Sequence, residues 1–217
     1  MKQLTLALIS LFLFGAQAKS QNIKEIFKAM PAEMTPLLTA NDKADFIDFM
    51  DSKMDAKVQN LLGGTSLMTR LSSDYLYVQM TKNSSLQMKL LPYKETYLIA
   101  LINTVYGPAR DSKLHVYNAN WEKFVGEPLF TKPKLDDFFK LDLFLADKSN
   151  SKLADLRAVD VSLVELSFDA DNLNIEVELH SLGYLDKELR DKLMPFFTKE
   201  LMYTWKDNHF ELQSKSE

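Results

Sequence analysis

The sequence contains no cysteine, and among its 217 residues there are only three histidines and six glycines. Without cysteine the chain can form no disulfide, zinc–thiolate site, iron–sulfur cluster or cysteine nucleophile. It also lacks an excess of positive charge: the formal net charge is −4, which argues against a nucleic-acid-binding protein. The hydrophobic content of 46% is enough for a packed core, so the composition excludes a disordered or collagen-like chain.

Long apolar runs are scarce, and the one with a clear meaning lies at the N-terminus. Lys2 precedes the apolar stretch 4–14, and Ala16 and Ala18 occupy the small-residue positions that signal peptidase reads. The stretch is about half of the roughly 20 residues that a membrane-spanning helix needs. We therefore expect residues 1–18 to be a signal peptide cleaved near Ala18, with no membrane span after its removal. Since a lipoprotein anchor requires cysteine, the expected product is soluble and periplasmic or secreted.

The first third of the mature chain has helical periodicity. Asn22 with Glu25 resembles a capping box at the start of a short helix. A stronger helix is predicted to begin at Thr39 to Asp42, with Asn41 as its N-cap. An extension of that helix through Val58 and Leu61 to the glycine pair at 63–64 is left open.

From Thr65 the hydrophobic period changes to alternation, which predicts strands. The run 97–106 is apolar on nearly every residue through Ile102, as expected of a central strand covered on both faces. A short helix is predicted from near Asp186 to Pro195. Hairpins are predicted for 75–80 with 86–90, for 159–168 with 173–179, and for 201–205 with 210–212.

These elements predict an α+β fold in which N-terminal helices pack on a mostly antiparallel sheet built from hairpins. The expected organisation is a signal peptide at 1–18, a helical segment at 19–64, and two β-hairpin regions at 65–146 and 153–217. The second region contains the short helix, and the whole of 65–217 as one domain is the open alternative. Because both regions are rich in hairpins, two similar β-rich halves are a further hypothesis.

No catalytic or metal motif is readable, so no catalytic residue, metal ligand or cofactor is predicted. His115, His180 and His209 have no second histidine at helical metal-binding spacing. A site that combines His180, His209 and Glu178 in three dimensions is conceivable, but no spacing supports it. Asp169–Asn174 fails as a calcium loop, because Leu173 stands where an oxygen ligand is needed.

Aromatic side chains provide the binding candidates. Tyr97, Tyr117 and Trp121 fall in one sheet-forming stretch and could line a groove for a peptide, glycan or lipid. The alternative is ordinary packing, since strands use aromatic residues for their cores. Arg110 is the fourth candidate, because it follows the Gly107–Pro108 turn, where it could pair with Asp111.

Several segments resemble an uncharacterised family of secreted bacterial proteins, a domain of unknown function. They are Leu61–Thr69 (LLGGTSLMT), Lys89–Pro92 (KLLP) and Thr104–Ser112 (TVYGPARDS). The resemblance covers most of the mature chain, but it implies no activity, substrate or catalytic residue.

The function is therefore open at this point. The leading hypothesis is a non-catalytic binding or accessory protein of the cell envelope, whose ligand is an unknown protein, glycan or lipid. The competing hypotheses are a hydrolase with a site assembled from scattered residues, and a structural partner in an envelope assembly. The sequence indicates no oligomeric state.

Overall fold

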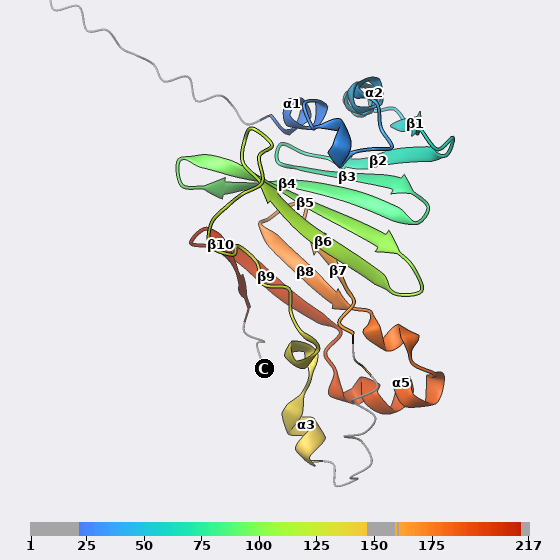
Figure 1. Ribbon diagram of the computed structural model, residues 1–217, viewed down its shortest axis with the longest axis vertical. Coiled ribbons are helices and arrows are strands. Elements are labelled where there is room, and N and C mark those ends of the chain that lie inside the picture. Colours follow the sequence, from blue (N-terminus) through green and yellow to red (C-terminus); the bar gives the residue numbers. More distant parts are fainter. Residues whose placement is uncertain (1–21, 147–158, 160, 214–217) are drawn as a thin grey trace, which may run out of the picture.

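The computed structural model describes residues 22–146, 159 and 161–213, so the expected signal peptide at 1–18 lies outside the described residues. The described chain forms three layers: N-terminal helices, a six-stranded sheet, and a four-stranded sheet with short helices at one end (Figure 1). The α+β class, with helices packed on antiparallel sheets, is confirmed.

The helical layer consists of α1 (Ile23–Lys28), the 3₁₀ turn η1 (Ala32–Met34) and α2 (Ala40–Asp51). Asn22 caps α1 as predicted, since its side chain accepts a hydrogen bond from the Lys24 amide. The predicted N-cap of α2 was wrong. Thr39 caps this helix, and it forms a reciprocal capping box with Asp42, so Asn41 lies inside the first turn.

The possible extension of α2 to the glycine pair does not occur. The helix ends at Asp51, Lys53 adopts a left-handed conformation, and β1 (Lys57–Gln59) follows. Val58 is buried while both its neighbours in β1 are exposed, which is the alternation of a strand rather than of a helix.

The large sheet is an antiparallel meander in which strand order follows the sequence from β1 to β6. Its predicted hairpin around 82–85 is confirmed, although the turn is tighter and comprises Lys82 and Asn83. The strands after β1 are β2 (Thr65–Leu71), β3 (Tyr75–Thr81), β4 (Ser84–Tyr93), β5 (Thr96–Tyr106) and β6 (Arg110–Tyr117).

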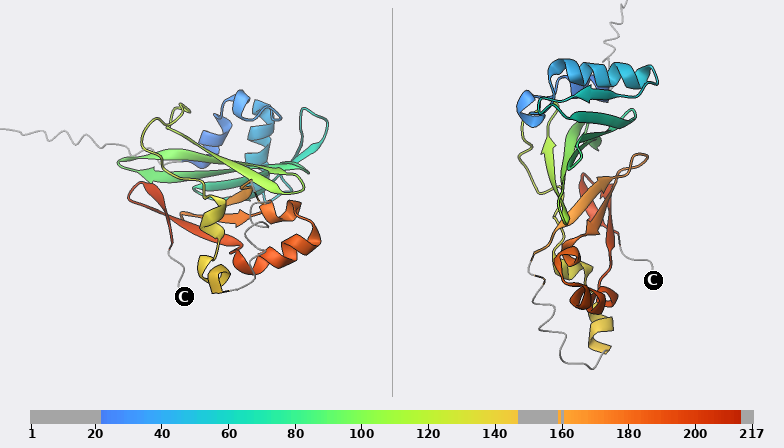
Figure 2. Two further views of the ribbon diagram at one scale, coloured as in Figure 1. Left: turned by 60° about the horizontal axis from the view of Figure 1, so that its bottom comes forward. Right: turned by 90° about the vertical axis from the view of Figure 1, so that its right-hand side faces the viewer.

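Strand β5 is covered on both faces, as its apolar run predicts. Leu98, Ala100 and Ile102 belong to the core shared with the second sheet, whereas Ile99 and Leu101 belong to the core under the N-terminal helices. The large sheet is therefore the middle layer of the molecule (Figure 2).

The second sheet is also an antiparallel meander, in the order β7–β8–β9–β10. Both predicted hairpins are present, and Asp186 caps the predicted short helix by accepting a hydrogen bond from the Leu189 amide. The elements are β7 (Val164–Phe168), β8 (Asn174–Leu179), η3 (Ser181–Tyr184), α5 (Lys187–Leu193), η4 (Met194–Phe196), β9 (Glu200–Lys206) and β10 (His209–Leu212).

Between the sheets the chain forms η2 (Leu135–Phe138) and α3 (Leu141–Ala146), which lie at the same end of the second sheet as α5 and η4. Phe139 packs its ring against Phe144 and Phe197, and its backbone bridges to Phe197. None of the helices in the described part of the chain combines the length and apolarity needed to cross a bilayer.

The two β-rich regions share a meander topology, because β3 to β6 and β7 to β10 each pair in sequence order. They differ at the middle connection, which is a two-residue turn between β4 and β5 but contains η3, α5 and η4 between β8 and β9. Internal duplication stays a prediction that a Cα superposition of the two regions would test.

The sheets meet where the edge of β7 contacts polar side chains of the large sheet. The amides of Leu166 and Phe168 donate hydrogen bonds to Ser112 Oγ and Gln87 Oε1, at 3.0 Å each. Lys89 Nζ donates to the carbonyls of Asp169 and Ala170 beyond the end of β7. A buried strand edge needs such partners for its backbone groups, which explains why Gln87, Lys89 and Ser112 are buried.

Candidate functional site

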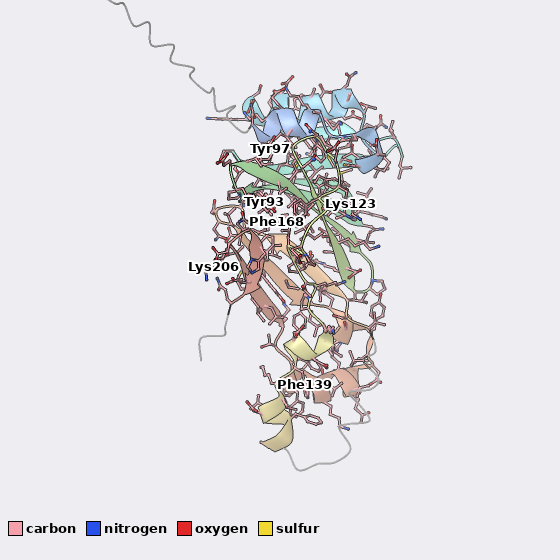
Figure 3. All side chains as sticks on the ribbon, turned by 60° about the vertical axis from the view of Figure 1, so that its left-hand side comes forward. Tyr93, Tyr97, Lys123, Phe139, Phe168 and Lys206 are labelled. Atoms are coloured by element: carbon pink, nitrogen blue, oxygen red, sulfur yellow. The ribbon has the colours of Figure 1, made fainter. Side chains whose placement is uncertain are left out.

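Three of the four predicted binding residues lie on the helix-facing side of the large sheet. Tyr97, Tyr117 and Trp121 are partly buried against the N-terminal core, and the rings of Tyr117 and Trp121 lie 5.9 Å apart. Tyr93, by contrast, packs against the other core, to which Phe168 of β7 also belongs (both labelled in Figure 3). The aromatic stretch is therefore divided between the two faces of the sheet.

Arg110, the fourth candidate, lies at the first residue of β6, at the opposite end of that strand from Tyr117. Its Nη1 donates to Glu165 Oε2 at 2.8 Å, and its guanidinium lies over the Tyr106 ring. The expected partner Asp111 instead accepts from Lys132 Nζ at 2.8 Å. Arg110 thus connects the large sheet to the outer face of the second sheet.

A row of carboxylates crosses that outer face. In the strand register Glu165 of β7 is opposite Glu178 of β8, and Glu178 is opposite Glu200 of β9. The alternation of these strands directs their apolar residues to the shared core and these glutamates away from it. Like charges in directly opposite positions destabilise a sheet unless cations lie nearby.

Cations do lie against this row. Lys199 Nζ is 2.7 Å from Glu178 Oε1, and Arg110 pairs with Glu165 as described above. These ion pairs shift the pKa values of both cations. Hydrogen bonding to Glu165 raises the pKa of Arg110, and hydrogen bonding to Glu178 raises the pKa of Lys199. Burial, followed by the charge of Glu200, raises the pKa of the neighbouring Glu176.

His180 completes the cluster just beyond the end of β8. Its Nε2 lies 3.3 Å from Glu165 Oε2 and 3.7 Å from Glu178 Oε1. This nitrogen is shielded from solvent. It forms no hydrogen bond to either carboxylate or to any other described residue. Glu165 and His180 are mostly buried, with 12% and 21% of their side chains exposed. We call Glu165, Glu178 and His180 the Glu–His cluster.

A pocket of about 190 Å³ adjoins this cluster. Its walls come from the turn before β6, the end of β8, the helical connection and the residues that lead into β9. The lining residues are Pro108, Glu178, Leu179, His180, Leu182, Gly183, Arg190, Met194, Phe197, Thr198 and Lys199.

Glu178 and His180 were named from the sequence as conceivable ligands, but Glu165 was not. Glu178 and His180 were considered as ligands together with His209, yet His209 lies on β10 and contacts Glu211 at 3.2 Å. Among the described residues, Glu165 takes that third place. Glu178 and His180 lie beside the pocket with 27% and 21% of their side chains exposed.

The fold and this site define an α+β protein with a charged pocket at one end of its second sheet. The chain belongs to the family described as "Protein of unknown function (DUF3256)", whose profile matches residues 15–210. The resemblance to a domain of unknown function is thereby confirmed.

A solved structure supports the same fold. The chain is similar to "Structure of a domain of an uncharacterized protein from Porphyromonas gingivalis W83", with a TM-score of 0.76 and 21% sequence identity. The match covers 88% of this chain and 98% of the other chain. No curated protein sequence matches the chain.

Proposed function

We propose that this protein is an exported, non-catalytic binding protein of the bacterial cell envelope, and that it holds a small anionic ligand in the pocket beside β8. The observation that supports this most is the composition of the pocket. Its lining residues include two cations, Arg190 and Lys199, and one carboxylate, Glu178, which pairs with Lys199 at 2.7 Å. Arg190 makes only a long, exposed contact with Asp191 at 3.8 Å, so its guanidinium is the group that a monoanion in the pocket would pair with.

The rest of the lining favours a ligand with an apolar part. Leu182, Met194 and Phe197 provide a hydrophobic wall, whereas the charged groups come from β8, α5 and the residues before β9. Ligand sites typically combine an apolar lining with a few polar groups that fix orientation. A small organic carboxylate or phosphate ester with a short apolar group fits this combination.

The ion pairs support binding rather than catalysis. The pKa of Arg110 and that of Lys199 are both raised, so each side chain is held more firmly in its charged form. General acid–base catalysis needs a group that gains and loses a proton near the working pH. Permanently charged side chains are suited to holding an anion, and of these two Lys199 lines the pocket.

Native mass spectrometry of the purified protein tests the pocket. Gly183 lines it in a backbone conformation open to other residues, and a Cβ there meets Pro108 O at an ordinary 3.9 Å. Gly183→Leu should therefore narrow the pocket and abolish a retained small molecule that the wild type carries. Val125→Phe, at a position that is 92% exposed, is the control and should retain it. A ligand retained equally by Gly183→Leu would contradict this location.

Export is tested separately. Expression of the full chain in a Gram-negative host should yield a periplasmic or secreted product whose N-terminus is Lys19, because the A-x-A pattern ends at Ala18. Intact-mass measurement after fractionation reads the cleavage directly. A cytoplasmic product that keeps Met1 would contradict the export proposal and leave the pocket proposal to its own test.

A hydrolase is the second candidate, and the observation that favours it is the placement of His180 between two carboxylates. Such a histidine could activate water if a substrate occupied the pocket. Hydrolysis of ester and phosphoester reporter substrates that is lost in His180→Gln but retained in His209→Gln would establish this candidate over the binding protein.

A further inference from the structure

The Glu–His cluster brings together three side chains with ligand atoms of the kinds that bind transition metals. The oxygen atoms of Glu165 and Glu178 and the ring nitrogen of His180 lie within 4.8 Å of one another. They come from adjacent strands and the residue after β8, so the sheet register fixes their backbone positions. Rigid elements of this kind position ligands more accurately than loops do.

The separations match those between the ligands of a small divalent ion. Zinc binds histidine nitrogen and carboxylate oxygen at about 2.0–2.2 Å, so two ligands on a tetrahedral ion lie about 3.3–3.6 Å apart. His180 Nε2 is 3.3 Å from Glu165 Oε2 and 3.7 Å from Glu178 Oε1. Each carboxylate therefore lies from the imidazole nitrogen at about the separation of two ligands on one ion, and all three ligand atoms lie within 4.8 Å of one another.

A metal ion would also give the ring nitrogen of His180 the interaction that it lacks. His180 Nε2 is shielded from solvent and makes no hydrogen bond with any described residue. Glu165 and Glu178 stand directly opposite each other, and their charges are offset only by the exposed side chains of Arg110 and Lys199. We propose that Glu165, Glu178 and His180 form a binding site for a divalent transition-metal ion such as Zn²⁺. This goes beyond the proposed small-anion ligand, since the ion can bind with or without it.

In the ion-free protein Arg110 and Lys199 neutralise the two carboxylates. Both side chains are long and exposed, at 50% and 64%, so each can move away without disturbing the core. A metal ion therefore competes with these two cations for Glu165 and Glu178. The pocket reaches Glu178 and His180 and provides the access route for the ion.

Isothermal titration of the EDTA-treated protein with Zn²⁺ tests the site, with circular dichroism to confirm folding of each variant. We expect one ion per chain, and at least tenfold weaker binding in Glu165→Gln, Glu178→Gln and His180→Gln, since each removes a direct ligand. His209→Gln is the matched control, because His209 and Glu211 form an exposed pair at 3.2 Å. Its affinity should stay within twofold of the wild type.

The competing cations give the sharpest readout. Arg110→Gln should bind Zn²⁺ several-fold more tightly, because it frees Glu165, and a variant that is merely damaged would not gain affinity. The proposal is overturned if the wild type binds no Zn²⁺ at 100-fold molar excess, if His180→Gln binds as well as the wild type, or if Arg110→Gln binds more weakly. Retention of the small anion by Gly183→Leu has no bearing on these outcomes.

Discussion

Two polar clusters lie along β7, and they differ in how completely their groups are paired. At the junction of the sheets, Lys89 is fully buried and reaches two carbonyls and the carboxylate of Asp74. In the Glu–His cluster, on the outer face, His180 Nε2 has no hydrogen-bond partner among the described residues. Arg110 and Lys199 hold its carboxylates through exposed side chains.

We infer from this difference that the junction is structural and that the Glu–His cluster is where a ligand binds. A buried group with all its partners stabilises one arrangement of the chain, because removal of any partner leaves a desolvated charge or dipole. A shielded nitrogen that forms no hydrogen bond gains no stabilisation from one, and beside a pocket it is available to a ligand. We therefore expect substitutions at the junction to affect stability and substitutions in the Glu–His cluster to affect binding.

The largest effect is expected for Lys89→Met, which keeps most of the length of the side chain but removes its ammonium group and charge. The carbonyls of Asp169 and Ala170 lose their donor and Asp74 loses its cation. Since removing one partner of a buried pair is strongly destabilising, unfolding in urea should show a loss of about 3 kcal/mol. A change below about 0.5 kcal/mol, the size seen at ordinary surface sites, would show that the junction is not structural.

Gln87→Leu should have the next largest effect. Its Oε1 accepts hydrogen bonds from the Phe168 amide and the Tyr75 hydroxyl, and both donors would be left unpaired inside the protein. The expected loss is about 2 kcal/mol, the cost of such unsatisfied groups. Gln59→Leu, on exposed β1, is the control and should be nearly neutral. Equal effects of the two substitutions would contradict the role of the junction.

The stability of the junction should depend on pH through Tyr75, whose hydroxyl donates a hydrogen bond to Gln87. Burial raises the pKa of Tyr75 to about 12. The unfolded chain loses this proton near pH 10, so from pH 10 to 12 it binds fewer protons than the folded chain and stability falls. Tyr75→Phe should cost about 1 kcal/mol at pH 8. Urea unfolding across this range should show that difference shrinking as the pH rises from 10 to 12. A constant difference would mean that Tyr75 is not buried as described.

The smallest effect on stability is expected for His180→Gln without metal. Since Nε2 forms no hydrogen bond, the free energy of unfolding should change by less than about 0.5 kcal/mol, the low end of what one hydrogen bond contributes. A loss of about 3 kcal/mol in the free energy of unfolding, as expected for Lys89→Met, would show that His180 is a structural residue. The two clusters would then not differ in role.

Much of the fold could be predicted because hydrophobic period depends on the sequence alone. The apolar run of β5 indicated burial on both faces, and Asp186 indicated the start of α5. The extension of α2 remained open because Val58 and Leu61 have helical spacing. In the structure Val58 pairs with Ser66 of β2, and Leu61 lies in the turn after β1. Thr39, rather than Asn41, caps the helix because Asp42 is placed to complete the capping box.

The Glu–His cluster could be predicted only in part, because it depends on strand register. A four-residue turn over 169–172 would place Glu176 opposite Glu165. The structure instead pairs Phe168 with Ile175, which brings Glu178 opposite Glu165 and His180 beside both. Arg110 reaches Glu165 across 55 positions of sequence. Such a contact depends on how the two sheets pack, and no local pattern encodes it.

Anomalous X-ray diffraction from crystals soaked in Zn²⁺ tests most directly whether the Glu–His cluster binds a metal ion. We expect a peak about 2.0–2.3 Å from Glu165 Oε2, Glu178 Oε1 and His180 Nε2, with Arg110 or Lys199 turned away. A peak at His209 and Glu211 alone, or no peak at the Glu–His cluster, would contradict the assignment and leave the cluster as a network of ion pairs.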